Sequence, residues 1–154
     1  MPPDLGPGTL DSIWIKRFRR GPMDPAREAR LVAGRGIVGN ANQGGKRQVT
    51  IISREAWGAA SRELGADVDP ATRRANLMVS GLELAKTRGR ILRVGDVRMR
   101  VYGETKPCWQ MEEARVGLQS ALKPDWRGGI FAEVLDDGTI AVGDRVEWVE
   151  EQAG

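Results

Sequence analysis

The stretch RGRILRVGDVRMRVYGE (residues 88–104) decides the fold class. Within it Val97, Met99 and Val101 alternate with charged or polar residues, so a strand here would have one buried side and one solvent-facing side. The Gly-Asp pair at 95–96 separates this run from the apolar residues before it, which is typical of a hairpin turn. The triplet VGD recurs at 142–144, between two further apolar runs. Two such strand-turn-strand units predict antiparallel hairpins rather than a parallel sheet.

Outside these units the pattern predicts further short strands and one long loop. Strands are expected over 9–18, over the apolar run VTIIS at 49–53, and from about Asn76 to Val79. Residues 19–48 carry glycine and proline throughout and indicate a long, partly ordered loop. Loops of that length inside compact domains are often functional.

Helices are predicted from their start and stop residues. Ser53 is placed to cap a helix over 54–64 that Gly65 ends, and Asp69 with Pro70 is placed to begin a short one. Residues 111–122 offer one more helix. The sum is a mainly-β domain, a small closed or partly closed barrel with two or three flanking helices. We expect a flexible leader over 1–8, one domain over 9–150 and a tail over 151–154.

Composition excludes several kinds of protein. The 24 basic and 21 acidic residues are interspersed, and the densest basic cluster is Lys16, Arg17, Arg19 and Arg20, so a nucleic-acid partner is not expected. No apolar run approaches the ~20 residues of a membrane helix, and the N-terminus lacks the pattern of a secretory signal. We therefore expect a cytoplasmic protein without a membrane partner.

The chain of 154 residues has no histidine and one cysteine. Ser-His-Asp and Cys-His catalysis, histidine metal sites and a histidine general base are thereby excluded. A single cysteine also excludes an internal disulfide.

That cysteine, Cys108, lies in ETKPCWQMEE (residues 104–113), near the start of the last predicted helix, with Thr105 as a candidate N-cap. The helix N-terminus and the neighbouring Lys106 both favour the thiolate, which is a nucleophile and a soft metal ligand without help from histidine. The alternative is a small buried apolar residue, which is the common role of a lone cysteine.

Two further segments carry candidate anion-binding residues. RRAN at 73–76 places Arg73, Arg74 and Asn76 beside a strand start, where they form a plausible clamp for a phosphate or carboxylate, or else a solvated helix end. GNANQGGKRQ at 39–48, with Asn42 and Arg47, combines glycines, amides and cations that suit an anion-binding nest, or a plain surface loop. This segment does not match the Walker or dinucleotide-binding patterns.

The order and spacing of these segments resemble the MOSC domain, the module named for the C-terminal part of molybdenum cofactor sulfurases, and in particular its small bacterial members. The resemblance spans about residues 9–149. It rests on RRGPM, AGRGIVGNANQGGKRQVTIIS, RRANLMVSGLELAKTRGRILRVGDVRMRVYGETKPC, MEEARVGLQSAL and WRGGIFAEVLDDGTIAVGDRVEW, with the single cysteine after a proline at the centre.

The resemblance implies a β-barrel and a molybdenum-pterin cofactor. Cys108 is then the reactive residue, either as a persulfide-bearing sulfur carrier or as a molybdenum ligand. The residues implied to hold the anionic pterin phosphate, or to support it, are Arg73, Arg74, Asn76, Arg47, Lys106 and Asn42. Molybdenum ion binding and pyridoxal phosphate binding are also expected from the family, and a sulfur donor or an electron-transfer protein is the expected protein partner.

The sequence departs from the family pattern in the glycine loop. Many members carry an aspartate and a histidine where this chain has Asn40 and Asn42. An amide can hydrogen-bond a ligand but cannot titrate, which favours binding or sulfur relay over acid–base catalysis. Two other functions stay open: molybdenum-dependent reduction of N-hydroxylated bases, and a non-catalytic module that binds an anionic ligand or partner through Arg47, Arg73 and Arg74.

Overall fold

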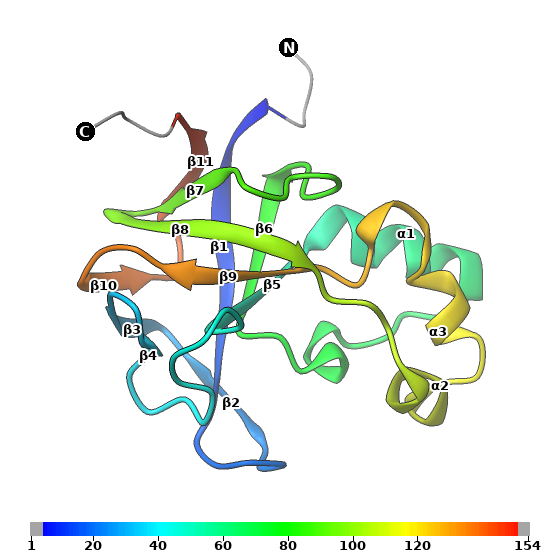
Figure 1. Ribbon diagram of the computed structural model, residues 1–154. Helices are drawn as coiled ribbons and strands as arrows, with labels where there is room; N and C mark the ends of the chain where they lie inside the picture. The colour runs from blue at the N-terminus through cyan, green and yellow to red at the C-terminus, as the bar shows by residue number, and fades with distance from the viewer. Residues whose placement is uncertain (1–4, 151–154) are drawn as a thin grey trace.

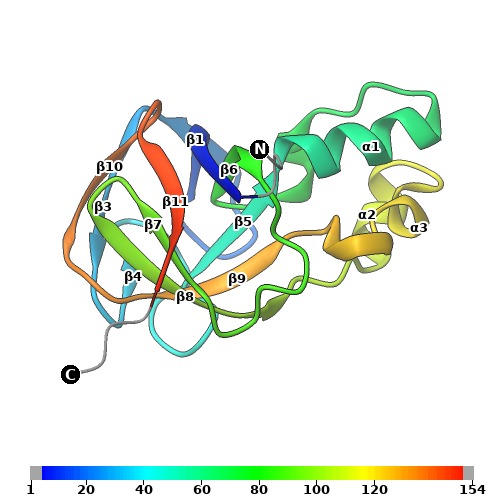
Figure 2. The same cartoon turned by 90° about the horizontal axis from the view of Figure 1, so that it is seen from above.

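A seven-stranded closed barrel forms the body of the protein (Figures 1 and 2). The structure is a computed structural model that describes residues 5–150; the expectations for residues 1–4 and 151–154 lie outside it. The barrel order is β11-β7-β8-β9-β5-β6-β1, and β1 pairs with β11 to close it. The bounds are β1 (Leu5–Lys16), β5 (Val49–Ser53), β6 (Leu77–Leu82), β7 (Ile91–Val94), β8 (Val97–Glu104), β9 (Ile130–Val134) and β11 (Arg145–Val149). The predicted mainly-β barrel is confirmed.

A small second sheet packs on the barrel and shares its core. It consists of β3 (Glu28–Val32), β4 (Gly36–Ile37) and β10 (Gly138–Ala141), in the order β10-β3-β4. Leu31, Ile37 and Ile140 from this sheet are fully buried in the same apolar cluster as Leu10 and Met99 of the barrel. The barrel interior is therefore filled by side chains from both sheets.

One of the two predicted hairpins is present. β7 and β8 pair antiparallel from Ile91↔Arg100 to Val94↔Val97 around the Gly-Asp turn. The second prediction is wrong, because β10 pairs with β3 whereas β11 pairs with β7 and β1. The expectation of purely antiparallel pairing is also wrong at one place, since β5 and β6 run parallel.

Two expected boundaries need correction. The segment 19–48 is not one continuous loop, because it contains the short strands β2 (Met23–Ala26), β3 and β4. The leader is also shorter than expected, since β1 begins at Leu5 and Gly8 pairs with Val146. The start of β1 pairs with a strand far away in sequence, where local pattern carries little signal, whereas β2 pairs with β1 and β4 with β3 over short separations.

The helices cover one side of the barrel, over β5 and β6 (Figures 1 and 2). They are α1 (Arg54–Leu64), η1 (Pro70–Arg73), α2 (Trp109–Ala114), α3 (Leu118–Ala121) and η2 (Pro124–Trp126). Trp57, Met78, Met111 and Leu118 belong to a second apolar cluster between this layer and the barrel wall. The single helix expected over 111–122 is two short helices, because the chain turns at Gly117 with a φ of 90°.

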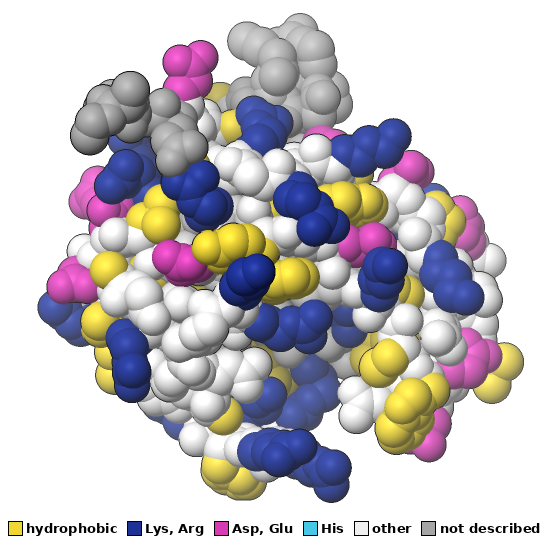
Figure 3. Space-filling model, viewed as in Figure 1, with side chains coloured by type: hydrophobic (Ala, Val, Ile, Leu, Met, Phe, Trp, Pro, Cys, Tyr) yellow, Lys and Arg dark blue, Asp and Glu magenta, His cyan; other side chains and the backbone are white. Residues whose placement is uncertain are grey.

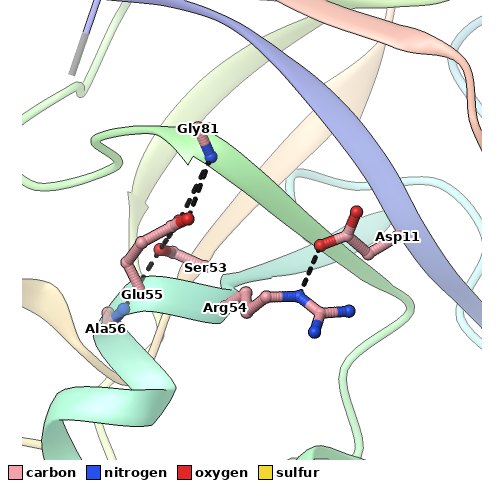
Figure 4. A network of polar contacts seen from close by, with 6 residues as sticks. All are labelled: Asp11, Ser53, Arg54, Glu55, Ala56 and Gly81. Carbon is pink, nitrogen blue, oxygen red and sulfur yellow. Dashed lines mark hydrogen bonds and ion pairs between the residues drawn. The ribbon is translucent and has the colours of Figure 1, made fainter. Parts of the chain in front are cut away.

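The start of α1 is fixed to the barrel by polar contacts (Figure 4). The Ser53 hydroxyl accepts from the Ala56 N–H, as the sequence predicts, and the Glu55 carboxylate accepts from the Gly81 N–H at 3.2 Å. Arg54 Nε lies 2.7 Å from the carboxylate of Asp11 on β1. At the other end Gly65 adopts the predicted left-handed conformation, with a φ of 66°. No helix within residues 5–150 is long and apolar enough to cross a membrane.

The tight approach of β9 to β5 gives the first prediction. At Gly129 the φ is +102° and an added Cβ would collide with the Ile51 carbonyl oxygen, whereas at Gly89 the φ is +85° and the space is open. Gly89→Ala should cost about 1–2 kcal/mol of unfolding free energy from backbone strain alone. Gly129→Ala should cost about 1–3 kcal/mol more, because the clash adds to the strain. Urea denaturation of both variants measures the difference, and equal losses would contradict the predicted packing.

Candidate functional site

A basic cavity of about 190 Å³ lies where β1 ends and β5 begins, beside the segment that leads to α2. Lys16, Arg47, Arg73 and Arg74 line it, and no acidic side chain does. Figure 3 shows Lys and Arg side chains gathered around a hollow in the lower half of the face, next to α2. The other lining residues are Met23, Asn40, Asn42, Thr50, Ala75, Asn76, Thr105, Gln110, Met111 and Gly128.

The floor of the cavity is organised by the carboxamide of Asn76, which is 5% exposed. Its Nδ2 donates to the Trp14 carbonyl at 3.2 Å and to Asn40 Oδ1 at 3.1 Å. Its Oδ1 accepts from the N–H and the hydroxyl of Thr50 at 3.1 and 3.3 Å. One side chain therefore joins β1, β5, the start of β6 and the 39–48 loop, and both ends of its amide are occupied inside the protein.

Asn40 holds the glycine-rich loop against the end of β1. Its Oδ1 accepts from the Lys16 N–H at 2.9 Å as well as from Asn76, and it is 5% exposed. Gln43 continues the loop structure by donating to the carbonyls of Ile37 and Asn40. Asn40 thus serves as a buried acceptor, whereas Asn42 from the same loop lines the cavity.

Arg73 is held by backbone carbonyls. Its Nε donates to the Gly128 oxygen and its Nη2 to the Thr105 oxygen, both at 2.9 Å. Burial lowers the pKa of Arg73 below its ordinary value; the nearby Cys108 raises it and Arg47 lowers it further. Carbonyl partners leave the charge of the guanidinium in place, so Arg73 brings a full positive charge to the cavity.

Two of the other three cations also have neutral partners. Arg74 Nη2 donates to the Gly21 carbonyl, and the Arg47 guanidinium lies 5.0 Å from the centre of the Phe131 ring. Burial lowers the pKa of Lys16, and the charges of Arg74 and Arg19 lower it further. None of the four lining cations forms an ion pair within residues 5–150. Such a concentration of one charge in a partly enclosed space favours an anionic ligand.

Cys108 lies at the rim of this cavity. It is the N-cap residue of α2, it is partly exposed, and it falls between the lining residues Thr105 and Gln110. Its Sγ lies 3.7 Å from Gln110 Oε1. The expectation that Thr105 caps the helix is wrong, because its hydroxyl donates to the Gly128 carbonyl instead. Lys106 is exposed and does not line the cavity.

The structure thus brings Arg47, Arg73, Arg74, Asn42 and Asn76 together around one space. Sequence reasoning assigned Lys16 only to a surface basic cluster and gave Thr50 and Gln110 no role. Lys16 lies at the end of β1, and other cavity residues also lie next to strand ends. This position is the signal that could have indicated a role for Lys16 in the site. Among the described residues no three Asp, Glu, Cys or His side chains gather into a metal-binding group.

The chain belongs to the MOSC domain family, whose model matches residues 38–147. This family is linked to molybdenum cofactor binding. No curated protein matches the chain.

Solved structures share the fold at low sequence identity. The YUAD protein of Bacillus subtilis superposes with a TM-score of 0.80 at 20% identity, covering 96% of this chain and 98% of the other. YiiM of Geobacillus stearothermophilus gives 0.76 at 17% identity, covering 94% and 76%. YiiM of Escherichia coli gives 0.69 at 19% identity, covering 95% and 72%. These structures share the fold of almost the whole chain.

The hydrogen bonds of Asn76 give the second prediction. Asn76→Ala leaves several buried groups without partners, each worth about 1–3 kcal/mol, so the unfolding free energy should fall by about 3 kcal/mol or more. Asn42→Ala is the matched control, because the Asn42 amide lines the same cavity but makes no hydrogen bond to the described residues. Its unfolding free energy should fall by no more than about 0.5 kcal/mol. Chemical denaturation measures both, and similar losses would refute the role given to Asn76.

Proposed function

We propose that the basic cavity binds the phosphate of a molybdenum-pterin cofactor or its precursor, and that Cys108 acts at its rim as a sulfur carrier or molybdenum ligand. The observation that carries the proposal is the group of four cations, none of which forms an ion pair within residues 5–150, around a cavity that ends beside the only thiol. Membership of the MOSC family supports a molybdenum-pterin phosphate as this anion.

The residues present fit such a ligand. Arginine and lysine side chains are the usual donors to phosphate oxygens, and a guanidinium can donate two hydrogen bonds at once. A cavity of about 190 Å³ is smaller than the ~300–1,000 Å³ of sites that enclose a whole drug-sized molecule. It therefore suits the phosphate end, with the rest of the ligand extending along the rim toward Cys108.

The chemistry assigned to Cys108 is thiol exchange. The Cys108 thiolate would attack the terminal sulfur of a donor persulfide, R–S–SH; the new bond gives Cys108–S–SH and the broken bond releases the donor as a thiolate, R–S⁻. This step needs no histidine and no outside oxidant. When bound, the cofactor itself would supply the redox-active metal, to which a thiolate is a suitable soft ligand.

Acid–base catalysis by the glycine loop is not part of the proposal, because Asn40 and Asn42 cannot titrate and Asn40 is committed to the fold. Reduction of N-hydroxylated bases would use the same cavity and the same thiol ligand, and turnover of the metal-loaded, electron-fed protein would establish it. The cavity would also accept the phosphate of pyridoxal phosphate, with Lys16 as its nearest amine.

Sulfur uptake tests the role of Cys108. Native protein exposed to a small persulfide donor should gain one reductant-removable sulfur by mass spectrometry, because the thiol is partly exposed. Cys108→Ser should gain none, yet should bind a pterin phosphate with unchanged affinity, since Cys108 does not line the cavity. If the wild-type thiol takes up no sulfur and binds no molybdenum, while anion binding persists, the protein is an anion-binding module with a structural cysteine.

The environment of Lys16 predicts a pH dependence. Its pKa lies below the ordinary value, so its ammonium loses the proton at a lower pH than a free lysine. Affinity for a phosphate monoester, measured by calorimetry, should therefore fall as the pH rises on the alkaline side of neutrality, where the ester stays a dianion. Lys16→Met should flatten this fall. Lys46→Met is the control, because Lys46 lies over the Tyr102 ring outside the cavity, and an equal effect there would contradict the assignment.

A further inference from the structure

Arg73 connects the anion cavity to the segment that carries Cys108. The guanidinium lines the cavity and also donates to the carbonyls of Thr105 and Gly128. Thr105 lies three residues before Cys108, and it bonds in turn to Gly128 through its hydroxyl at 2.6 Å and to Gly129 through its N–H at 2.9 Å. One side chain therefore contacts both the ligand space and the backbone that leads to the thiol.

The positive charge of Arg73 can act both on a ligand in the cavity and on the segment that carries Cys108. Its two carbonyl partners orient the guanidinium without neutralising it, and no carboxylate within residues 5–150 forms an ion pair with it. Cys108 is the negative group that raises the pKa of Arg73, against the larger effect of burial. The two side chains are therefore close enough to interact electrostatically.

We propose that Arg73 is a positioning residue that couples occupancy of the cavity to the reactivity of Cys108. This inference rests on the proposed function, because it requires an anion in the cavity. A phosphate that takes up the guanidinium donors would compete with the carbonyls of Thr105 and Gly128, and so disturb the backbone that places the sulfur. The thiol then reacts faster when the cavity is empty and more slowly when it is filled, so Cys108 would take up sulfur before the phosphate-bearing ligand docks.

The test is the rate of Cys108 alkylation by iodoacetamide, an uncharged electrophile, with and without saturating inorganic phosphate at constant ionic strength. Wild-type protein should react at least about fivefold more slowly with phosphate, which is the lower end of coupling between ligand sites. Arg73→Lys keeps a cation but loses the planar fork that bridges the two carbonyls. At phosphate concentrations that calorimetry shows to be saturating for this variant, its rate should change less than about twofold.

Arg74→Lys is the matched control. Arg74 lines the same cavity but donates to the Gly21 carbonyl, away from Cys108. Its substitution should weaken phosphate binding, yet saturating phosphate should still slow alkylation. Thermal unfolding of both variants checks that the fold is intact.

The outcomes distinguish a failure of this coupling from a failure of the proposed function. If phosphate binds wild-type protein without changing the alkylation rate, the coupling is overturned and the anion cavity stands. If phosphate does not bind, both the coupling and the proposed anion cavity are overturned. If Arg73→Lys is slowed by phosphate as much as the wild type, the effect is steric or belongs to another cation, and the assignment to Arg73 is wrong. The wild-type comparison tests the coupling without any variant.

Discussion

The site depends on one buried carboxamide. Asn76 is 5% exposed, so its two donors and its acceptor oxygen need partners inside the protein, and they find them on β1, β5 and the 39–48 loop. Satisfying that single amide sets the relative positions of all three segments. Arg73 and Arg74 lie three and two residues before Asn76 in the chain, so the same constraint also fixes where their side chains begin.

The cavity differs electrostatically from the rest of the surface. Elsewhere arginines meet carboxylates, as Arg98 does with Asp136 and Arg54 with Asp11. Around the cavity the arginines bond to carbonyls or lie over a ring, which orients them without reducing their charge. Arg73 is partly buried in this way, and a buried cation without a counter-charge is costly, so an anionic ligand would relieve that cost. Cys108 lies where such a ligand would leave the enclosed space.

Local signals made part of this arrangement predictable from sequence. α1 was predictable because Ser53 and Gly65 mark both of its ends, and the β7–β8 hairpin because of its Gly-Asp turn. The sequence could indicate the RRAN segment as an anion clamp. It could not indicate that the Asn76 side chain bonds within the protein, since its partners Trp14, Asn40 and Thr50 lie 26 to 62 residues away. The β3–β10 pairing joins residues still farther apart in sequence, from Gly138↔Leu31 to Ala141↔Glu28, and Lys16 joins the cavity only once the barrel has closed.

The central claim is that this cavity is an anion site built on Lys16, Arg73 and Arg74. Titration of a phosphate monoester into protein with ¹⁵N-labelled arginine, followed through the side-chain Nε–H resonances by NMR, tests it most directly. The account predicts saturable binding at one site, with the resonances of Arg73, Arg74 and Arg47 shifting together and those of Arg98 and Arg54 unmoved. Shifts spread over the surface arginines, or no saturation, would contradict it.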